Sequence, residues 1–310
     1  MTLLMTLGGA LLLMVAGDAL VRGAIGLSLK LGLSATLISL TVVAFGTSAP
    51  ELVISVEAAL SGSTDIALGN VVGSNVANVL LIVGVPASIV VLSVSSPELR
   101  RSFTLMLIAT VLFVGLSMTG EIGRIGGLTM LAALAAMIVY SYRMASDTEE
   151  TLSDDDDQLP NWKVGALLFV GVIGLPIGAH FLIEGAKEIA LSFGLSEAAI
   201  GLTIVALGTS LPELAASTAT ALRGRGDVAL ANVIGSNMLN LLAVIGATAV
   251  IAPLHVSRSF QTVDIPIMAV TSLLLAPFLI WKMKLGRVAG LSFLAFYVVF
   301  VALALGDASI

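Results

Sequence analysis

Charged residues are scarce in this sequence. Asp, Glu, Lys and Arg together make up 11% of the 310 residues, whereas an ordinary soluble domain has about 25%. Hydrophobic residues make up 58%, and the mean hydropathy is +1.09. This balance excludes an ordinary soluble domain and predicts an integral membrane protein.

Cysteine is absent, and histidine occurs only twice. Without cysteine there is neither a disulfide nor a thiolate metal site. The HExxH zinc motif and the Walker A pattern, GxxxxGK followed by Ser or Thr, are also missing. These absences argue against an intramembrane enzyme and against an ATP-driven pump. We expect no cofactor and no nucleic-acid partner.

Long apolar windows recur along the whole chain. A window of about 20 residues matches a hydrocarbon core of about 30 Å at about 1.5 Å per residue, and the short alternating segments of an outer-membrane barrel are missing. We therefore predict an all-α integral membrane protein with ten transmembrane helices. No basic region precedes the first span, so we interpret that span as a helix rather than a signal peptide. The predicted spans are residues 2–29, 33–61, 66–92, 102–119, 124–143, 163–191, 195–222, 227–252, 263–281 and 286–306.

An internal repeat divides the chain. A shift of 162 residues aligns residues 41–84 with 203–246 without a gap, and 24 of the 44 positions are identical. Each copy holds five spans, and because five is odd the second copy enters the membrane in the opposite orientation. We predict two inverted-topology five-helix repeats, residues 1–143 (TM1–5) and 163–310 (TM6–10), joined by an acidic cytoplasmic linker at 144–162. Inverted repeats place substrate sites near the bilayer midplane, at the interface between the repeats, and are typical of transporters.

Basic residues predict the orientation, because they favour the cytoplasmic side. With the N-terminus outside, ten Lys and Arg residues near span ends are cytoplasmic and three are outside. The ten are Lys30, Arg100, Arg101, Arg143, Lys163, Arg223, Arg225, Lys282, Lys284 and Arg287, and the three are Arg124, Lys187 and Arg258. We expect a multi-pass protein of the plasma membrane with both termini outside and the linker in the cytoplasm.

An acidic, proline-containing hexapeptide lies inside the second span and again inside the seventh. It is GTSAPE at residues 46–51 and GTSLPE at residues 208–213. A carboxylate at membrane depth is expensive, needs a partner and indicates function by default. Because the two copies belong to inverted repeats, Glu51 and Glu213 are predicted to form two walls of one site.

The prolines of these hexapeptides are expected to break their helices. Proline lacks an N–H, and its ring crowds the carbonyl one turn back. Pro50 and Pro212 thereby free carbonyl oxygens next to Thr47 and Thr209. Such broken helices are tolerated at membrane depth where the freed backbone faces protein or a cavity. Carbonyl, hydroxyl and carboxylate oxygens would then lie together.

A second pair of motifs completes this set of oxygens. It is GSNVAN at residues 73–78 and GSNMLN at residues 235–240. A spacing of four residues puts two polar side chains on one helix face in each copy, namely Ser74 with Asn78 and Ser236 with Asn240. Oxygen ligands without histidine or thiolate favour hard cations such as Ca²⁺ or Na⁺. One Ca²⁺, two Na⁺ or two protons would each neutralise the two glutamates, so one pocket can hold these loads in turn.

The GTSxPE and GSNxxN stretches, one pair in each half of the chain, resemble the alpha repeats of the sodium/calcium exchangers, prokaryotic type, in the calcium:cation antiporter (CaCA) superfamily. The likeness covers nearly the whole chain and is most specific at residues 41–84 and 203–246. It implies Ca²⁺ extrusion in exchange for Na⁺ by alternating access, in which the first and sixth helices slide past a core.

The resemblance also implies the site residues. Calcium would be held by Glu51, Glu213 and the carbonyls of Thr47 and Thr209, and sodium by Ala44, Ser48, Ser74, Ala206, Ser210 and Ser236, with Asn78 and Asn240 near the centre.

One position departs from the family pattern. Many relatives, notably potassium-dependent ones and several prokaryotic ones, have an aspartate where this chain has Asn240. The site is then one carboxylate poorer. The departure argues against potassium dependence and against a protonated acid at the centre.

Several alternatives remain open at this point. Ca²⁺/H⁺ exchange is the alternative transport reaction, and a cation channel could use the same glutamates as a selectivity ring. The glutamates could also be a structural pair, and the asparagines could serve interhelical hydrogen bonding.

Asp18 and Arg22 are four residues apart and could neutralise each other; His180 and Glu184 occupy the equivalent positions in the second repeat. The acidic run at 154–157 lacks the glycine and spacing of an EF-hand, so we interpret it as solvated linker. Apart from the lipid bilayer, no obligatory partner is inferred.

Overall fold

The computed structural model of the chain describes residues 2–92, 96–144, 159–192 and 208–307. These residues are almost entirely helical, and η marks a π-helix. The elements are α1 (Thr2–Leu31), α2 (Ala35–Ile38), η1 (Ser39–Val43), α3 (Ala44–Thr47), α4 (Ala49–Leu60), α5 (Thr64–Ala77), η2 (Asn78–Ile82), α6 (Gly84–Ile89), α7 (Pro97–Ser117), β1 (Glu121–Ile122), α8 (Arg124–Met144), α9 (Asn161–Ser192), α12 (Leu211–Leu222), α13 (Gly226–Leu239), η5 (Asn240–Val244), α14 (Ile245–Ile251), β2 (Leu254–His255), η6 (Phe260–Asp264), α15 (Ile265–Leu273), α16 (Ala276–Leu279) and α17 (Arg287–Asp307).

Helices of membrane-spanning length dominate the described residues. Seven are long and apolar enough to cross a bilayer, and the bent pair Ala35–Thr47 and Ala49–Leu60 makes an eighth. Two predicted spans are not among them. The span at 195–222 is described only from residue 208, and the apolar part of α17, Arg287–Leu303, is shorter than the others. The chain is thus a polytopic helical membrane protein, and ten spans remain a prediction.

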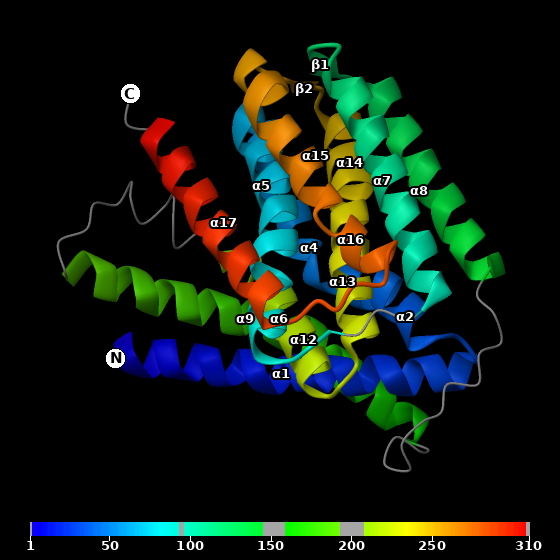
Figure 1. Ribbon diagram of the computed structural model, residues 1–310. Helices are drawn as coiled ribbons and strands as arrows, with labels where there is room; N and C mark the ends of the chain where they lie inside the picture. Colours follow the sequence, from blue (N-terminus) through cyan, green and yellow to red (C-terminus); the bar gives the residue numbers. More distant parts are fainter. Residues whose placement is uncertain (1, 93–95, 145–158, 193–207, 308–310) are drawn as a thin grey trace.

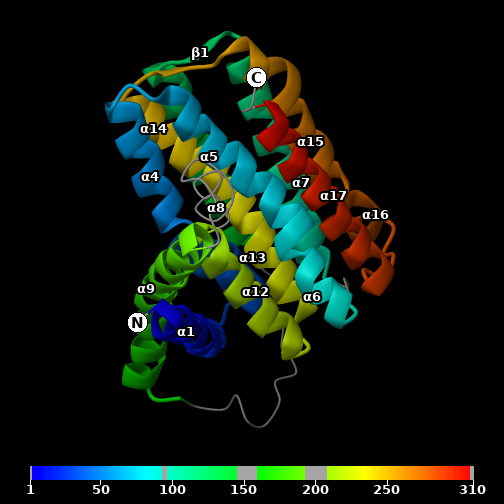
Figure 2. The same cartoon turned by 90° about the vertical axis from the view of Figure 1, so that its left-hand side faces the viewer.

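Two groups of helices lie at a large angle to each other. In Figure 1 the helices α4, α5, α7, α8, α13, α14, α15 and α17 form an upright bundle, while α1 and α9 lie side by side across its lower end. Figure 2 shows α1 nearly end-on, outside that bundle. The first helix of the chain and the long helix after the linker therefore form a layer of their own.

Glycines bring α1 and α9 into close contact. A Cβ added at Gly9 would lie 2.5 Å from the backbone nitrogen of Leu182, and one added at Gly171 would lie 2.5 Å from the Cβ of Leu20. These contacts run in opposite directions along the two helices, so the pair is antiparallel. Small residues allow this approach because lipid supplies no hydrophobic driving force between membrane helices.

The centre of the bundle is formed by α13 with α14 and by α5 with α6. In the most apolar window of Gly226–Ile251, 94% of the residues are buried, and in that of Thr64–Ile89 the share is 72%, compared with 22% for α8. The central spans carry the GSNxxN motifs. These motifs are therefore shielded from lipid, as a polar site at membrane depth requires.

The elements around the motifs recur at the same shift of 162 residues as the sequence repeat. α4 and α12, α5 and α13, and η2 and η5 are matched in both start and length. The turn from α4 to α5 contains Gly62, with a φ of +81°, and the matching turn from α12 to α13 contains Gly224, with a φ of +77°. Only glycine adopts this conformation without steric cost. Local structure thus repeats along with the sequence.

The two ends of the bundle differ in character. At one end β1 pairs with β2, in the register Glu121 with His255 and Ile122 with Leu254. The opposite end, at the bottom of Figure 1, holds the end of α8, the start of α7, and the connections between α12 and α13 and between α16 and α17. There the Arg100 guanidinium donates to the carbonyl of Ile280 over 2.6 Å. The predicted cytoplasmic basic residues of these segments therefore share one end of the bundle.

Candidate cation site

In both hexapeptides a helix begins directly after the serine, which lies two residues before the proline. Ser48 has φ −86° and ψ 4°, and Ser210 has φ −87° and ψ 1°, so the two breaks have the same backbone shape. In the first copy the helix bends by 45° between Thr47 and Ala49. This confirms the predicted break. The reason is physical: proline fits the first turn of a new helix but not the interior of an old one.

The breaks place both glutamates in the first turn of a new helix. Glu51 lies in the first turn of α4 and Glu213 in the first turn of α12. Each side chain is 1% exposed. The Ser48 hydroxyl donates to Glu213 Oε1 over 3.2 Å, joining the two hexapeptides across 165 positions of sequence. The structure therefore brings the duplicated acids into one buried region.

The GSNxxN motifs meet in the same interior. Asn78 Nδ2 donates to Asn237 Oδ1 over 2.9 Å, and Asn240 Nδ2 donates to Asn75 Oδ1 over 3.2 Å. All four side chains are 1% exposed. The reciprocal pairing of the motifs means that α5 and α13 cross in an antiparallel sense. The asparagines of one repeat thus lie against those of the other.

Sequence reasoning missed Asn75 and Asn237 as functional residues. It selected the serine and the last asparagine of each motif by their helical spacing, and it treated the intervening asparagine as ordinary sequence. The available signal was the identity of this asparagine in both copies of the repeat.

Six polar oxygens of the predicted site are buried without a hydrogen-bond partner in the described part of the chain. They are Glu51 Oε2, Glu213 Oε2, Asn78 Oδ1, Asn240 Oδ1, Ser210 Oγ and Ser236 Oγ. A buried, unsatisfied polar group costs about 1–3 kcal/mol, and more when it is charged. Two carboxylate oxygens and four neutral oxygens form the donor set that hard cations take. The residues present therefore fit a Ca²⁺ or Na⁺ substrate.

The remaining predicted site residues have different outcomes. Ser74, Thr47 and Ala44 are buried, with 5%, 1% and 0% of their surface exposed. The Thr47 hydroxyl donates to the carbonyl of Ala44 over 3.2 Å. Thr209 is half-buried at the start of the second break. Ala206 lies outside the described residues, as does the acidic run at 154–157.

A further pair of asparagines fastens the broken helices to their neighbours. Asn70 Nδ2 donates to the carbonyl of Glu51 over 3.1 Å and to Ser55 Oγ over 2.9 Å. At the equivalent place, Asn232 Nδ2 donates to Ser217 Oγ over 3.0 Å. These bonds hold the first turns after the breaks, and hence the glutamates, against α5 and α13.

Close backbone packing holds α13 against η1 and α3 next to the site. A Cβ at Gly235 would lie 2.3 Å from the carbonyl oxygen of Leu40 and 2.9 Å from the Cβ of Ala44. Only glycine permits α13 to approach η1 and α3 this closely. Gly235 directly precedes Ser236, so this contact fixes the depth at which the second GSNxxN motif lies.

A π-helical turn begins at each central asparagine. η2 starts at Asn78 and η5 starts at Asn240, and the amide of Val83 donates to the carbonyl of Asn78 over 3.2 Å. Single π-turns inside α-helices are rare and occur frequently at functional sites. The sequence analysis did not predict them, because hydrophobic periodicity does not distinguish one wide turn from ordinary helix.

The spacing left open a pairing of Asp18 with Arg22, and the structure gives Asp18 a different partner. The Asp18 carboxylate pairs with Arg223, whose Nε lies 2.9 Å from Asp18 Oδ1 and whose second guanidinium nitrogen contacts the same oxygen. The two side chains are 43% and 39% exposed. The sequence spacing pointed to a contact within α1, but the crossing of α1 over α12 brings a better partner into reach.

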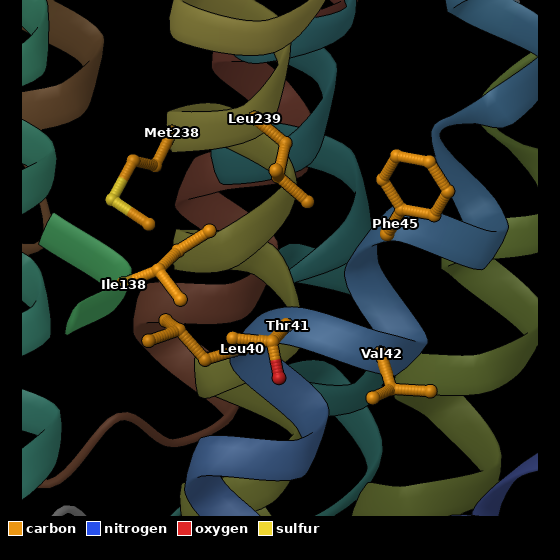
Figure 3. A pocket seen from close by; sticks show the side chains of 7 residues that line it. All are labelled: Leu40, Thr41, Val42, Phe45, Ile138, Met238 and Leu239. Atoms are coloured by element: carbon orange, nitrogen blue, oxygen red, sulfur yellow. The ribbon is translucent and has the colours of Figure 1, made fainter. Parts of the chain in front are cut away.

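An apolar groove lies beside the site but does not belong to it. It has a volume of about 330 Å³ and is lined by Leu40, Thr41, Val42, Phe45, Ile138, Met238 and Leu239. Figure 3 shows that these side chains come from the helix that leads to the first break, from α13 and, in the case of Ile138, from α8. The Thr41 hydroxyl donates to the carbonyl of Leu37 over 2.7 Å. A wall of this kind suits hydrocarbon and does not suit a cation.

Taken together, these features define a class of protein. A helical membrane protein in which buried carboxylates and unpaired oxygens come together from two sequence repeats has the features of an ion carrier. Comparison with known families is specific: residues 1–143 and 163–306 match the sodium/calcium exchanger protein family. The chain belongs to this family and is a membrane antiporter of cations.

Relatives match over almost their entire length. The putative antiporter CaxA of Alkalimonas amylolytica is 37% identical over 289 residues, covering 90% of this chain and 89% of the relative. The sodium/calcium exchanger MaX1 of Methanosarcina acetivorans is 31% identical, covering 96% and 97%. A solved structure of the sodium-calcium exchanger NCX_Mj superposes with a TM-score of 0.85 at 30% identity, covering 97% of this chain and 98% of the other. The fold is therefore that of a sodium-calcium exchanger.

Proposed function

We propose that this protein extrudes Ca²⁺ across the plasma membrane in exchange for Na⁺, by alternating access to one central site. The observation that carries the proposal is the meeting of Glu51 and Glu213 in one buried region, linked through Ser48 and surrounded by unpaired oxygens. Two carboxylates carry the charge that one Ca²⁺ or two Na⁺ neutralise. One load therefore excludes the other, which is the basis of exchange.

The proposed ligand set is made of oxygens from both repeats. Calcium is held by the two glutamates and the backbone carbonyls of Thr47 and Thr209, and the hydroxyls and amides take part in binding sodium. This division follows charge, since a divalent ion gains twice as much as a monovalent ion from each carboxylate. The sodium positions are Ala44, Ser48, Ser74, Ala206, Ser210 and Ser236, with Asn78 and Asn240 at the centre.

The layer formed by α1 and α9 is the proposed moving part. It lies across the bundle (Figure 1) and packs on it through an apolar cluster in which Leu20, Val43 and Leu175 are buried. Gly17 approaches the backbone of Ala215 in α12, where an added Cβ would lie at 3.2 Å. We propose that this apolar contact, with the small residues Gly17 and Ala215 at its closest approach, lets the two helices slide past the bundle. Sliding of α1 and α9 past the bundle then exposes the site to one side of the membrane at a time.

We also infer the inverted ten-helix topology and its orientation. Reciprocal hydrogen bonds between the GSNxxN motifs require α5 and α13 to run in opposite directions, as two inverted repeats would. The basic connections share one end of the bundle, which supports a cytoplasmic location for that end. Both termini are then outside, and the linker at 144–162 is cytoplasmic.

Flux into proteoliposomes tests the proposed function. Vesicles loaded with Na⁺ and diluted into Na⁺-free ⁴⁵Ca²⁺ medium should accumulate the isotope, and Glu213→Gln vesicles should not. Uptake driven by an outward proton gradient but indifferent to Na⁺ would show Ca²⁺/H⁺ exchange instead. Single-channel currents in planar bilayers would show a channel.

A further inference from the structure

The buried amide network at the crossing of α5 and α13 contains a backbone anchor. Asn237 Nδ2 lies 3.4 Å from the carbonyl oxygen of Asn75, and Asn75 Nδ2 lies 3.5 Å from the carbonyl oxygen of Asn237. A backbone carbonyl can only accept a hydrogen bond. The carbonyl of Asn75 therefore requires the nitrogen end of the Asn237 side-chain amide to face it. The carbonyl of Asn237 places the same requirement on the Asn75 side chain.

The anchor determines the orientation of the next amide. With its nitrogen held by a carbonyl, Asn237 turns Oδ1 toward Asn78, whose Nδ2 donates to it over 2.9 Å. Asn75 does the same for Asn240 over 3.2 Å. If Asn78 were rotated by half a turn, two oxygens would face each other at that distance. The orientation propagates from backbone to Asn237 to Asn78, and likewise from backbone to Asn75 to Asn240.

The far end of each central amide is its oxygen. Asn78 Oδ1 and Asn240 Oδ1 are buried and accept no hydrogen bond in the described part of the chain. A cation is attracted by the oxygen end of an amide and repelled by the hydrogen-bearing nitrogen end. Which end faces the ion therefore decides whether each asparagine helps or hinders binding.

We propose that Asn75 and Asn237 are positioning residues that hold the carbonyl oxygens of Asn78 and Asn240 toward the transported cation. This inference rests on the proposed function, because it concerns the same site. The two residues do not contact the ion; they act through the central asparagines. Outer contacts that orient metal ligands contribute about 10–100-fold to metal affinity.

A double-mutant cycle tests this role. Aspartate in place of Asn78 presents an oxygen whichever way it turns, so it no longer needs orientation. Asn237→Leu should weaken equilibrium ⁴⁵Ca²⁺ binding by the purified full-length protein about 10–100-fold in the parent chain. In the Asn78→Asp chain the same substitution should not weaken binding by more than about threefold, because an aspartate presents an oxygen to the ion in either orientation and removing Asn237 also removes the amide oxygen that would face the carboxylate. Thr110→Val is the matched control, because it removes a buried hydrogen bond within α7, Thr110 to the carbonyl of Met106, and should leave binding unchanged.

The mirror cycle keeps the test decisive if Asn237→Leu does not fold. Asn75→Leu, in the parent and in the Asn240→Asp chain, should give the same pattern. Equal losses in both backgrounds, or no loss in either, would overturn the positioning role while leaving Ca²⁺ binding, and thus the proposed function, intact. Absence of Ca²⁺ binding by the parent chain would overturn the proposed function itself.

Discussion

Glu213→Gln separates the charge of the site from its shape. Glutamine has nearly the same size as glutamate, and its side-chain oxygen can still accept the hydrogen bond from Ser48. Only the negative charge is lost. Since Glu213 is 1% exposed, solvent does little to compensate the ion for the lost interaction with the carboxylate.

The expected effect follows from the burial of this carboxylate. Removing one partner from a buried pair of charges costs about 3–5 kcal/mol. At about 1.4 kcal/mol per tenfold change, Ca²⁺ affinity should fall by about two to three and a half orders of magnitude. The Coulomb energy is proportional to the charge of the ion, so Na⁺ should lose only about half of that free energy. The preference for Ca²⁺ over Na⁺ should therefore fall as well.

The assay is equilibrium ⁴⁵Ca²⁺ binding, together with Na⁺ binding measured by calorimetry, on purified protein. Glu57→Gln is the matched control, because Glu57 is an exposed glutamate of the same α4 helix that carries Glu51. It should bind both ions as the parent does. Equal losses for Ca²⁺ and Na⁺, or a folded Glu213→Gln protein with unchanged Ca²⁺ affinity, would refute the reasoning.

Three further predictions concern the surroundings of the site. Gly235→Ala places a Cβ 2.3 Å from the carbonyl oxygen of Leu40 and should destabilise the protein by about 1–3 kcal/mol. Thermal unfolding measures this loss. Gly115→Ala is the control, because a Cβ there meets nothing within 4 Å, and it should not destabilise the protein. Pro50→Ala restores an N–H for the carbonyl of Gly46 and should straighten the bend; Ca²⁺ affinity should fall without loss of thermal stability, and an unchanged affinity would argue against a role for the break. Asp18→Arg or Arg223→Asp breaks a half-exposed ion pair between α1 and the end of α12, worth about 0.2–1 kcal/mol. Each single reversal should change the exchange rate by up to about fivefold, and the double reversal should restore the rate of the parent. Rates equal to that of the parent in both single variants and in the double variant would show that the pair does not influence the movement.

The sequence predicted a helical membrane protein and singled out the duplicated acids, because both rest on strong physical constraints. Apolar windows of bilayer length have few interpretations, and the duplicated GTSxPE motif could be recognised without any structure. The break at Ser48 followed from proline chemistry alone. The orientation of each predicted site residue did not follow, because it depends on contacts between segments more than 150 residues apart.

Particular misses show where sequence reasoning ended. Asn75 and Asn237 act across the crossing of α5 and α13, and no spacing within one helix reveals that crossing. The spacing within α1 suggested a contact of Asp18 with Arg22, but α1 crosses α12 and Asp18 contacts Arg223. The π-turns at Asn78 and Asn240 leave the hydrophobic pattern nearly unchanged. Each miss is a tertiary contact or a local distortion that the one-dimensional pattern does not record.

Displacement of bound ⁴⁵Ca²⁺ by Na⁺ tests the central claim, that one pocket holds either ion but not both. Purified protein equilibrated with ⁴⁵Ca²⁺ should release all of it as Na⁺ is raised, with a Hill coefficient above one, because at least two Na⁺ are needed to neutralise Glu51 and Glu213. K⁺ at matched ionic strength and pH should not reproduce this curve. Retention of ⁴⁵Ca²⁺ at saturating Na⁺ would contradict the account, since the two ions would then occupy separate sites.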